Sequence, residues 1–447
     1  MTRRILGIEV RRSVAPWVSG LLLLIALGML HLSGAPWTKG PIAWTEQLAA
    51  TSHWTRFMLV FLWPLAIGAG ALQGRRDHRS GMTELLSSTP RPALHRVAGT
   101  GLALALLLVL TYLALLVFGG VQALAHSGYL GLAWLPNALV GVLGLVAGAW
   151  FGLGIGRAFP ARLVPPLLSL ASLVAMIALS IEGNGIPNQV ALLSPALQSM
   201  KNVFLTVSTA ATAGQAVWLA GLAVTGVLLM TASTLRTRLV AFLPMALGVA
   251  LALAVLPSTA ADTYVVDPVA AEQVCRGAVC TSRMHEARLA DLKGPADEAL
   301  RMLSKLPDAP TAVREFTGEV PIFGGRPRAA DAVTVDFDEW RPAKPTGAEL
   351  TRFLVAGAGV APCYNLNTAG PVVDREHAAR MVTAAYFTGE LKPLAGSKVL
   401  SAAAMPDAEK AWATLRALPE PEQLARVEAA RHIGLTCEGE QLEALTR

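Results

Sequence analysis

Seven long apolar runs, separated by more polar segments, occupy the first 257 residues of the chain. Each run is close to the length of about 20 residues with which a helix crosses a bilayer. Most Arg and Lys residues of this part lie between the runs rather than within them. The pattern predicts transmembrane helices at 14–33, 55–73, 98–120, 134–156, 163–181, 215–235 and 239–257.

The pattern changes after residue 259 to the mixed periods of helices and strands. Strands are predicted at 312–320 and 332–340. Helices are predicted at 284–305, 346–358, 373–389, 407–418 and 421–433. The remaining length is enough to bury a core. We therefore expect an α-helical integral membrane protein with a six-span core at 1–235, a seventh span within 236–259, and an extracytoplasmic α+β domain at 260–447.

Composition separates the same two parts. Hydrophobic residues make up 53% of the chain, charged residues 15%, and the mean hydropathy is +0.49, which is too apolar for a soluble enzyme. Residues 1–259 contain five acidic side chains, whereas residues 260–447 contain 26. The C-terminal part is therefore acidic and solvated, in contrast to the basic, apolar first part.

The loop charges predict an orientation, because Arg and Lys are retained on the cytoplasmic side of a membrane. With the N-terminus inside, the opposite loops hold only Lys39, Arg56 and Lys201. The cytoplasmic segments then hold 13 cations: Arg3, Arg4, Arg11, Arg12, Arg75, Arg76, Arg79, Arg91, Arg96, Arg157, Arg162, Arg236 and Arg238. Seven spans put the C-terminal domain outside. Richness in Ala, Leu, Gly and Arg suggests a bacterium, so a bacterial cell membrane is the expected location.

All four cysteines, Cys275, Cys280, Cys363 and Cys437, lie in the part predicted to be outside. An even number confined to an oxidising compartment is typical of disulfides. Three pairings are open, and we favour Cys275 with Cys280 and Cys363 with Cys437, because the first pair closes a tight local loop. Zinc binding is the alternative, but the spacing suits no common zinc site.

A glycine stripe marks the fourth apolar run, where Gly144, Gly148, Gly152 and Gly156 recur every four residues. Such a stripe lets a neighbouring helix backbone approach closely. The runs hold almost no ionisable residues, and Arg56 lies near a predicted interface. Because intramembrane ionisable groups mark proton and ion paths, a proton-driven carrier or channel is disfavoured.

A basic loop between the second and third runs is the strongest indication of function. Its residues 74–91 predict a short helix at Thr83–Ser87, closed by Pro90, that would offer a docking surface to a partner on the cytoplasmic side. A simply solvated charged loop is the alternative. The chain itself contains no G-x-x-x-x-G-K-[ST] nucleotide loop, so any ATPase must be another polypeptide.

This loop resembles that of the type-2 permeases of ABC exporters, in which basic residues precede a Gly-Thr-x-Glu-Leu-Leu motif and a later proline. The matching residues are Arg79, Gly81, Glu84, Leu85, Leu86 and Pro90, while Met82-Thr83 departs from the pattern by one residue. The resemblance covers residues 1–235. It implies that Thr83–Ser87 is a coupling helix in a groove of a separate ABC-type ATPase, with Glu84 as its main polar contact. It also implies a homodimer of this chain with two ATPase copies, which would bind ATP and Mg²⁺.

The outer segment 183–213 is similar to the re-entrant helices of such permeases, and Pro195–Val207 is predicted as a short helix. The seventh span and the outer domain depart from the six-span pattern. The implied function is therefore the permease subunit of an exporter for an amphipathic or apolar cargo such as a drug, lipid or modified peptide. The alternative is a membrane-anchored receptor or assembly factor that acts through its outer domain.

The sequence gives little support for an enzyme. His285-Glu286 begins an H-E-x-x-H helix, but Leu289 stands where the second metal ligand is needed. His377 and His432 are expected on helix surfaces. We therefore predict a non-catalytic subunit that binds membrane lipid and partner proteins, with no catalytic residue, metal or cofactor of its own and no nucleic-acid partner.

Overall fold

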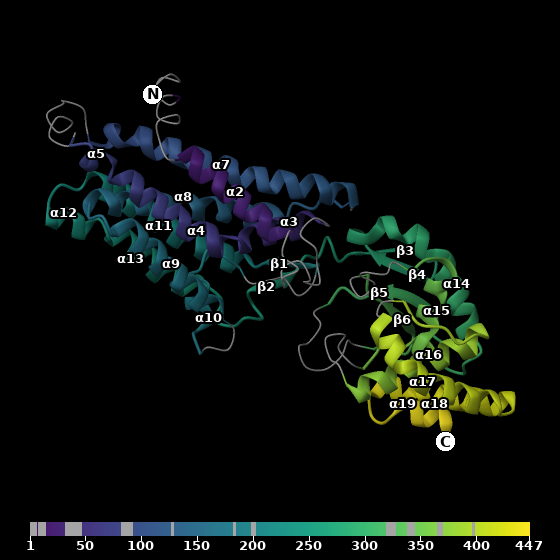
Figure 1. Cartoon of the computed structure of the whole chain (residues 1–447). Helices are drawn as coiled ribbons and strands as arrows, with labels where there is room; N and C mark the ends of the chain where they lie inside the picture. Colours follow the sequence, from purple (N-terminus) through teal and green to yellow (C-terminus); the bar gives the residue numbers. More distant parts are fainter. Residues whose placement is uncertain are drawn as a thin grey trace. The chain divides into compact units, whose positions relative to one another are not determined.

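The computed structural model describes residues 7, 15–31, 47–81, 93–126, 129–181, 185–197, 203–318, 328–337, 345–363, 370–395 and 398–447. The chain forms two compact units (Figure 1). The helical unit comprises residues 1–126 and 130–267, and the C-terminal unit comprises residues 127–129 and 268–447. Residues 260–267 belong to the helical unit because a strand in this stretch pairs with a strand of that unit.

Helices, most of the longer ones apolar, form the helical unit. They are α2 (Ala15–His31), α3 (Leu48–Phe57), α4 (Leu59–Gly74), α5 (Arg76–Arg79), α7 (Ala93–His126), α8 (Trp134–Ala158), α9 (Val164–Ser180), α10 (Asn188–Ala191), α11 (Thr209–Thr231), α12 (Leu235–Val240) and α13 (Leu243–Val255). Local sequence signals explain where several of these helices begin. Prolines occupy the first turns of α9 and α13, where a missing backbone N–H costs nothing. The Ser208 hydroxyl caps α11 by accepting from the Ala211 N–H at 3.3 Å.

Each of the seven predicted spans corresponds to an apolar helix. Among the described residues, four helical stretches are long and apolar enough to cross a membrane: 98–125, 134–158, 209–231 and 235–255. The pair α3 and α4 would form a fifth, bent by 51° at Met58. Helices α2 and α9 are shorter, with 17 residues each. The unit is compatible with a multi-pass membrane protein, and six or seven crossings stay a prediction.

The predicted helix at Pro195–Val207 is wrong over its described residues. Residues 195–197 are not helical, and Leu205–Val207 form strand β1. Strand β1 pairs antiparallel with β2 (Tyr264–Val266), so that Leu205 lies opposite Val266. Thr and Val favour extended backbone, and the partner strand, which lies far along the sequence, satisfies the backbone groups that a helix would have satisfied.

The C-terminal unit has a four-stranded sheet in the order β3-β4-β5-β6. Strands β3 (Gln273–Arg276) and β4 (Val279–Ser282) form an antiparallel hairpin, whereas β5 (Ala312–Glu315) and β6 (Ala332–Val335) add in parallel. The hairpin turn uses Gly277 at φ +66°, a conformation that favours glycine. The two predicted strands are confirmed in shortened form, and the hairpin was not predicted.

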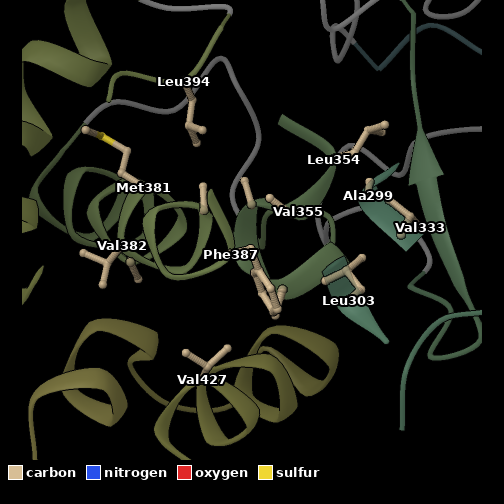
Figure 2. Close-up of a cluster of buried hydrophobic side chains, with 14 of the residues drawn as sticks. Ala299, Leu303, Val333, Leu354, Val355, Met381, Val382, Phe387, Leu394 and Val427 are labelled. Atoms are coloured by element: carbon tan, nitrogen blue, oxygen red, sulfur yellow. The ribbon is translucent and has the colours of Figure 1, made fainter. Parts of the chain in front are cut away.

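Helices make up the other described elements of this unit. They are η1 (Arg283–Arg288), α14 (Leu289–Leu303), α15 (Gly347–Val355), η2 (Ala356–Gly359), α16 (Pro371–Thr388), α17 (Lys398–Arg416), α18 (Glu420–Thr436) and α19 (Gln441–Thr446). Helix α14 packs against strands β3, β4 and β5. Helix α16 is buried on nearly all sides. Figure 2 shows the core around it, in which side chains from α14, β6, α15, α18 and the segment after α16 meet those of α16: Ala299, Leu303, Val333, Leu354, Val355, Met381, Val382, Phe387, Leu394 and Val427.

Candidate functional site

A buried arginine lies at the centre of the polar interior of the helical unit. Arg56, in the last turn of α3, is 0% exposed. Its Nε–H donates to the Pro195 carbonyl at 2.9 Å, and Nη1 donates to Asn137 Oδ1 at 2.8 Å. Its Nη2 donates to Gln215 Oε1. One guanidinium therefore joins α3, α8 and α11 to the segment that follows α10.

The same cluster satisfies the backbone of that segment. Gln215 Nε2 donates to the carbonyls of Leu192 and Ser194, both at 2.9 Å. With the Arg56 bond to Pro195, three carbonyls outside regular helix receive hydrogen bonds from buried side chains. Non-helical backbone within an apolar helical bundle is stable only where such partners exist. The cluster therefore holds segment 192–195 inside the unit.

The electrostatics of the cluster are unusual. The acceptors of Arg56 are a carbonyl and two side-chain amides, all neutral, and its contacts with the described residues include no carboxylate. A buried cation without a counter-ion is costly and depends on its hydrogen bonds. The hydroxyl of Tyr112 on α7, also buried, has no hydrogen-bond partner in the described part of the chain and lies against Gly141 of α8.

The glycine stripe of α8 lies against neighbouring elements. A Cβ at Gly152 would collide with the carbonyl of Ile67, and a Cβ at Gly156 with that of Ala71. Gly148 lies under the Trp63 ring, and Gly144 faces Pro195. Helix α4 contributes its own glycines, because Gly70 and Gly74 face the carbonyls of Ala149 and Leu153. Glycines from both helices thus bring the backbones of α4 and α8 into contact.

The helical unit has a basic end. Arg75 Nε, just after α4, donates to the Pro160 carbonyl at 3.0 Å in the connection between α8 and α9. In the same connection, the Phe159 ring lies 5.5 Å from the guanidinium carbon of Arg238 on α12. Three loops that carry predicted cytoplasmic cations therefore meet at one end, the end that α5 and α12 occupy in Figure 1.

At the opposite end of the helical unit, Asn188, the first residue of α10, connects this helix to the segment that follows α13. Its Nδ2 donates to the carbonyls of Pro257 and Thr259, each at 2.9 Å, and to Thr263 Oγ1 at 3.0 Å. A cavity of about 50 Å³ lies beside it. Leu192 and Ser194 line this cavity, so the segment held by the Arg56 cluster forms one of its walls.

Only part of the predicted coupling loop is described. Arg79 ends α5 and is exposed, and Gly81 has φ +67° with open space around it. The other predicted coupling residues, Thr83, Glu84, Leu85, Leu86 and Pro90, lie outside the described residues.

The cysteine pairing that we favoured is the one that the structure has. Cys275 bonds to Cys280 across the β3–β4 hairpin. Cys363 bonds to Cys437, the residue that directly follows α18, across a sequence separation of 74.

The histidines of the C-terminal unit differ in their surroundings. His285 is buried and its Nδ1 lies 2.5 Å from Glu315 Oε1. The described residues contain no group of three potential metal ligands. The expectation of a surface position is wrong for His377, which is 5% exposed and lies 3.0 Å from Ser401 Oγ. Burial, helped by the charge of Arg380, lowers the pKa of His377 to about 4. His432 is exposed, as predicted.

Comparison of this chain with protein-family models, with curated proteins and with solved structures gives no match. Sequence reasoning missed Arg56 as a central residue, although one signal was present. Ser52 lies four residues before Arg56, and a helix places residues at this spacing on one face.

Proposed function

We propose that this chain is the permease subunit of an ATP-driven ABC exporter, working with a separate ATPase. The observation that carries the proposal is the Arg56 cluster. Non-helical backbone and a charged side chain inside an apolar bundle are typical of transport pathways, where a segment must be held in one state and released in another. A helix bundle that serves only as an anchor has no need of either feature.

The basic end of the helical unit supports a cytoplasmic docking face. Arg75 and Arg238 take part in contacts among three loops there, and the predicted coupling loop continues directly from α5 at this end. Positive charge favours the cytoplasmic side. In our proposal the ATPase binds this face, and ATP-driven closure of the motor shifts the coupling loop and with it α4 and α7.

We further propose that two copies of the chain form a homodimer and that the path runs between them. Except for Arg56, the helix interiors offer few charges, which favours an amphipathic or apolar cargo such as a drug, a lipid or a modified peptide. The C-terminal domain would then lie outside the cell membrane, where its two disulfides are stable.

Affinity purification of the tagged protein in mild detergent tests the proposal. We expect a soluble polypeptide with a Walker motif to co-purify, and Glu84→Arg to abolish its recovery by reversing the charge of the coupling contact. Glu182→Arg, which reverses an acidic residue in a predicted outer loop, is the matched control and should leave recovery unchanged. Normal recovery with Glu84→Arg would remove the coupling role of that residue.

A receptor or assembly factor is the second candidate. The C-terminal unit favours it, because this unit has its own core and a cavity lined by charged residues. Purification of the chain without any ATPase, but with proteins bound at its outer domain, would support this candidate over the exporter.

A further inference from the structure

The C-terminal unit contains a cavity of about 140 Å³ beside the Cys363–Cys437 disulfide. Helices α16 and α19, which pack against each other, supply most of its wall. One buried water requires a cavity volume of about 10–15 Å³. The volume of this cavity is therefore large enough for a small organic molecule of several non-hydrogen atoms. The lining residues are Cys363, Val372, Arg375, Glu376, Cys437, Gly439, Glu440, Gln441 and Leu442.

Glu376 is the principal polar group of this wall. Its Oε1 accepts from the Cys363 N–H at 2.6 Å and from Gln441 Nε2 at 3.4 Å. Its Oε2 makes no hydrogen bond to the part of the chain that the structure describes. Among the described residues, one carboxylate oxygen is thus fixed by hydrogen bonds while the other keeps its capacity to accept.

The charge of Glu376 is only partly compensated. Burial raises the pKa of this carboxyl, and the opposing effects of the Cys363 N–H, Arg380, Arg328 and Gln441 are smaller. Neither Arg328 nor Arg380 lines the cavity. Their guanidinium groups donate to the carbonyls of Pro362 and Val360. A positive charge inside the cavity would therefore stabilise the ionised carboxylate.

The other charged lining groups form one ion pair. Arg375 Nη2 lies 2.9 Å from Glu440 Oε1, and the two side chains are 46% and 48% exposed. An ion pair between such exposed side chains contributes little to stability. The lining residues therefore include two carboxylates and one guanidinium, and because this guanidinium is paired with Glu440, Glu376 is the lining carboxylate left to receive a cation.

We propose that this cavity binds a small organic ammonium ion, whose ammonium group donates to Glu376 Oε2 and whose apolar part lies against Val372 and Leu442. Glu440 provides a second acceptor when it turns from Arg375. The site is independent of the exporter proposal, because it lies wholly within the C-terminal unit.

Isothermal titration calorimetry of the full-length protein in detergent tests this site with three probes of similar shape: propylammonium, propionate and 1-propanol. We expect binding of propylammonium alone. Glu376→Gln should weaken that binding roughly tenfold or more, because it removes a charge-assisted hydrogen bond. Glu440→Gln, at an exposed position that leaves the fold intact, should weaken it less. Glu438→Gln, outside the cavity, is the matched control and should bind normally.

Several outcomes would overturn the site. They are equal binding of propionate or propanol, no heat from propylammonium at millimolar concentrations, and unchanged affinity in both Glu376→Gln and Glu440→Gln. Thermal unfolding of each variant separates loss of the site from loss of the fold. Co-purification of an ATPase is measured separately, so failure of the exporter proposal and failure of this site are distinguishable.

Discussion

Arg56 shows how one side chain can organise a whole apolar interior. Its three hydrogen bonds reach two side-chain amides and one backbone carbonyl, and Gln215 extends the network to two more carbonyls. The planar guanidinium fork suits this divergent set of acceptors better than the single ammonium of lysine. The geometry, rather than the charge alone, explains why arginine occupies the position.

Replacement of Arg56 by Gln should destabilise the helical unit by roughly 3 kcal/mol, because buried acceptors on Pro195, Asn137 and Gln215 lose their donor. Arg56→Lys should recover only part of the loss. Thermal unfolding in detergent, followed by tryptophan fluorescence, measures both changes. Arg79→Gln, at an exposed position, is the control and should have little effect. An unchanged melting temperature for Arg56→Gln would contradict the role of the cluster.

His377 should make the C-terminal unit sensitive to acid. Its folded-state pKa of about 4 lies below the ordinary value of 6.5, so the unfolded chain takes up the proton more readily. The contribution of His377 to the free energy of unfolding is therefore fully present above pH 6.5. This contribution, up to about 3 kcal/mol, is lost as the pH falls towards 4.

His377→Gln should flatten this part of the stability profile, measured by chemical denaturation between these pH values. Glu376 and Arg380 are present in both proteins, so their own titration and charge do not account for the difference. His432→Gln, at an exposed position, should leave the slope unchanged. The same slope in His377→Gln and the parent protein would exclude His377 as its source.

The sequence could not identify the Arg56 cluster as a site. Hydropathy averaged over a span conceals a single arginine, and the acceptors of Arg56 come from three other parts of the chain. Asn137 and Gln215 are ordinary polar residues in apolar helices until folding brings them to the same guanidinium. The charged loop was recognisable because its residues are contiguous, and most of them lie outside the described part of the chain.

At the scale of elements, the contact between α4 and α8 depends on glycine on both sides. Gly152→Ala should destabilise the helical unit, because the added Cβ would collide with the Ile67 carbonyl and force two backbones apart. Gly20→Ala in α2 is the matched control, since open space surrounds that glycine. It should be neutral or stabilising, by up to about 1 kcal/mol. Equal melting temperatures for the two variants, measured in detergent, would contradict the close contact.

Several helices and strands could be predicted from sequence patterns alone. Continuous apolar runs and amphipathic periods located the main helices and two parallel strands, because those signals are local. The regular spacing of Gly144 to Gly156 predicted a close helix contact, but α4 could not be named as the partner. The β1–β2 pairing was missed because neither three-residue strand carries a local signal strong enough to identify its distant partner.

At the scale of the whole molecule, the two disulfides should contribute unequally. The Cys363–Cys437 bond spans 74 residues and the Cys275–Cys280 bond spans 5. Because each bond restricts the unfolded chain, we expect the Cys363–Cys437 bond to stabilise the folded unit by roughly 4 kcal/mol and the Cys275–Cys280 bond by roughly 2 kcal/mol. Chemical denaturation of the two double serine variants measures the difference. A larger loss from Cys275→Ser with Cys280→Ser would show that chain restriction is not the dominant effect.

The β1–β2 pair joins the start of α11 to the segment that leads into the C-terminal unit. Strand β2 ends at Val266, two residues before the C-terminal unit begins at Pro268, and β1 ends one residue before the Ser208 cap of α11. Antiparallel hydrogen bonds join the two strands along their length. A pull on the C-terminal unit through this connection would therefore reach the first turn of α11, the helix that carries Gln215.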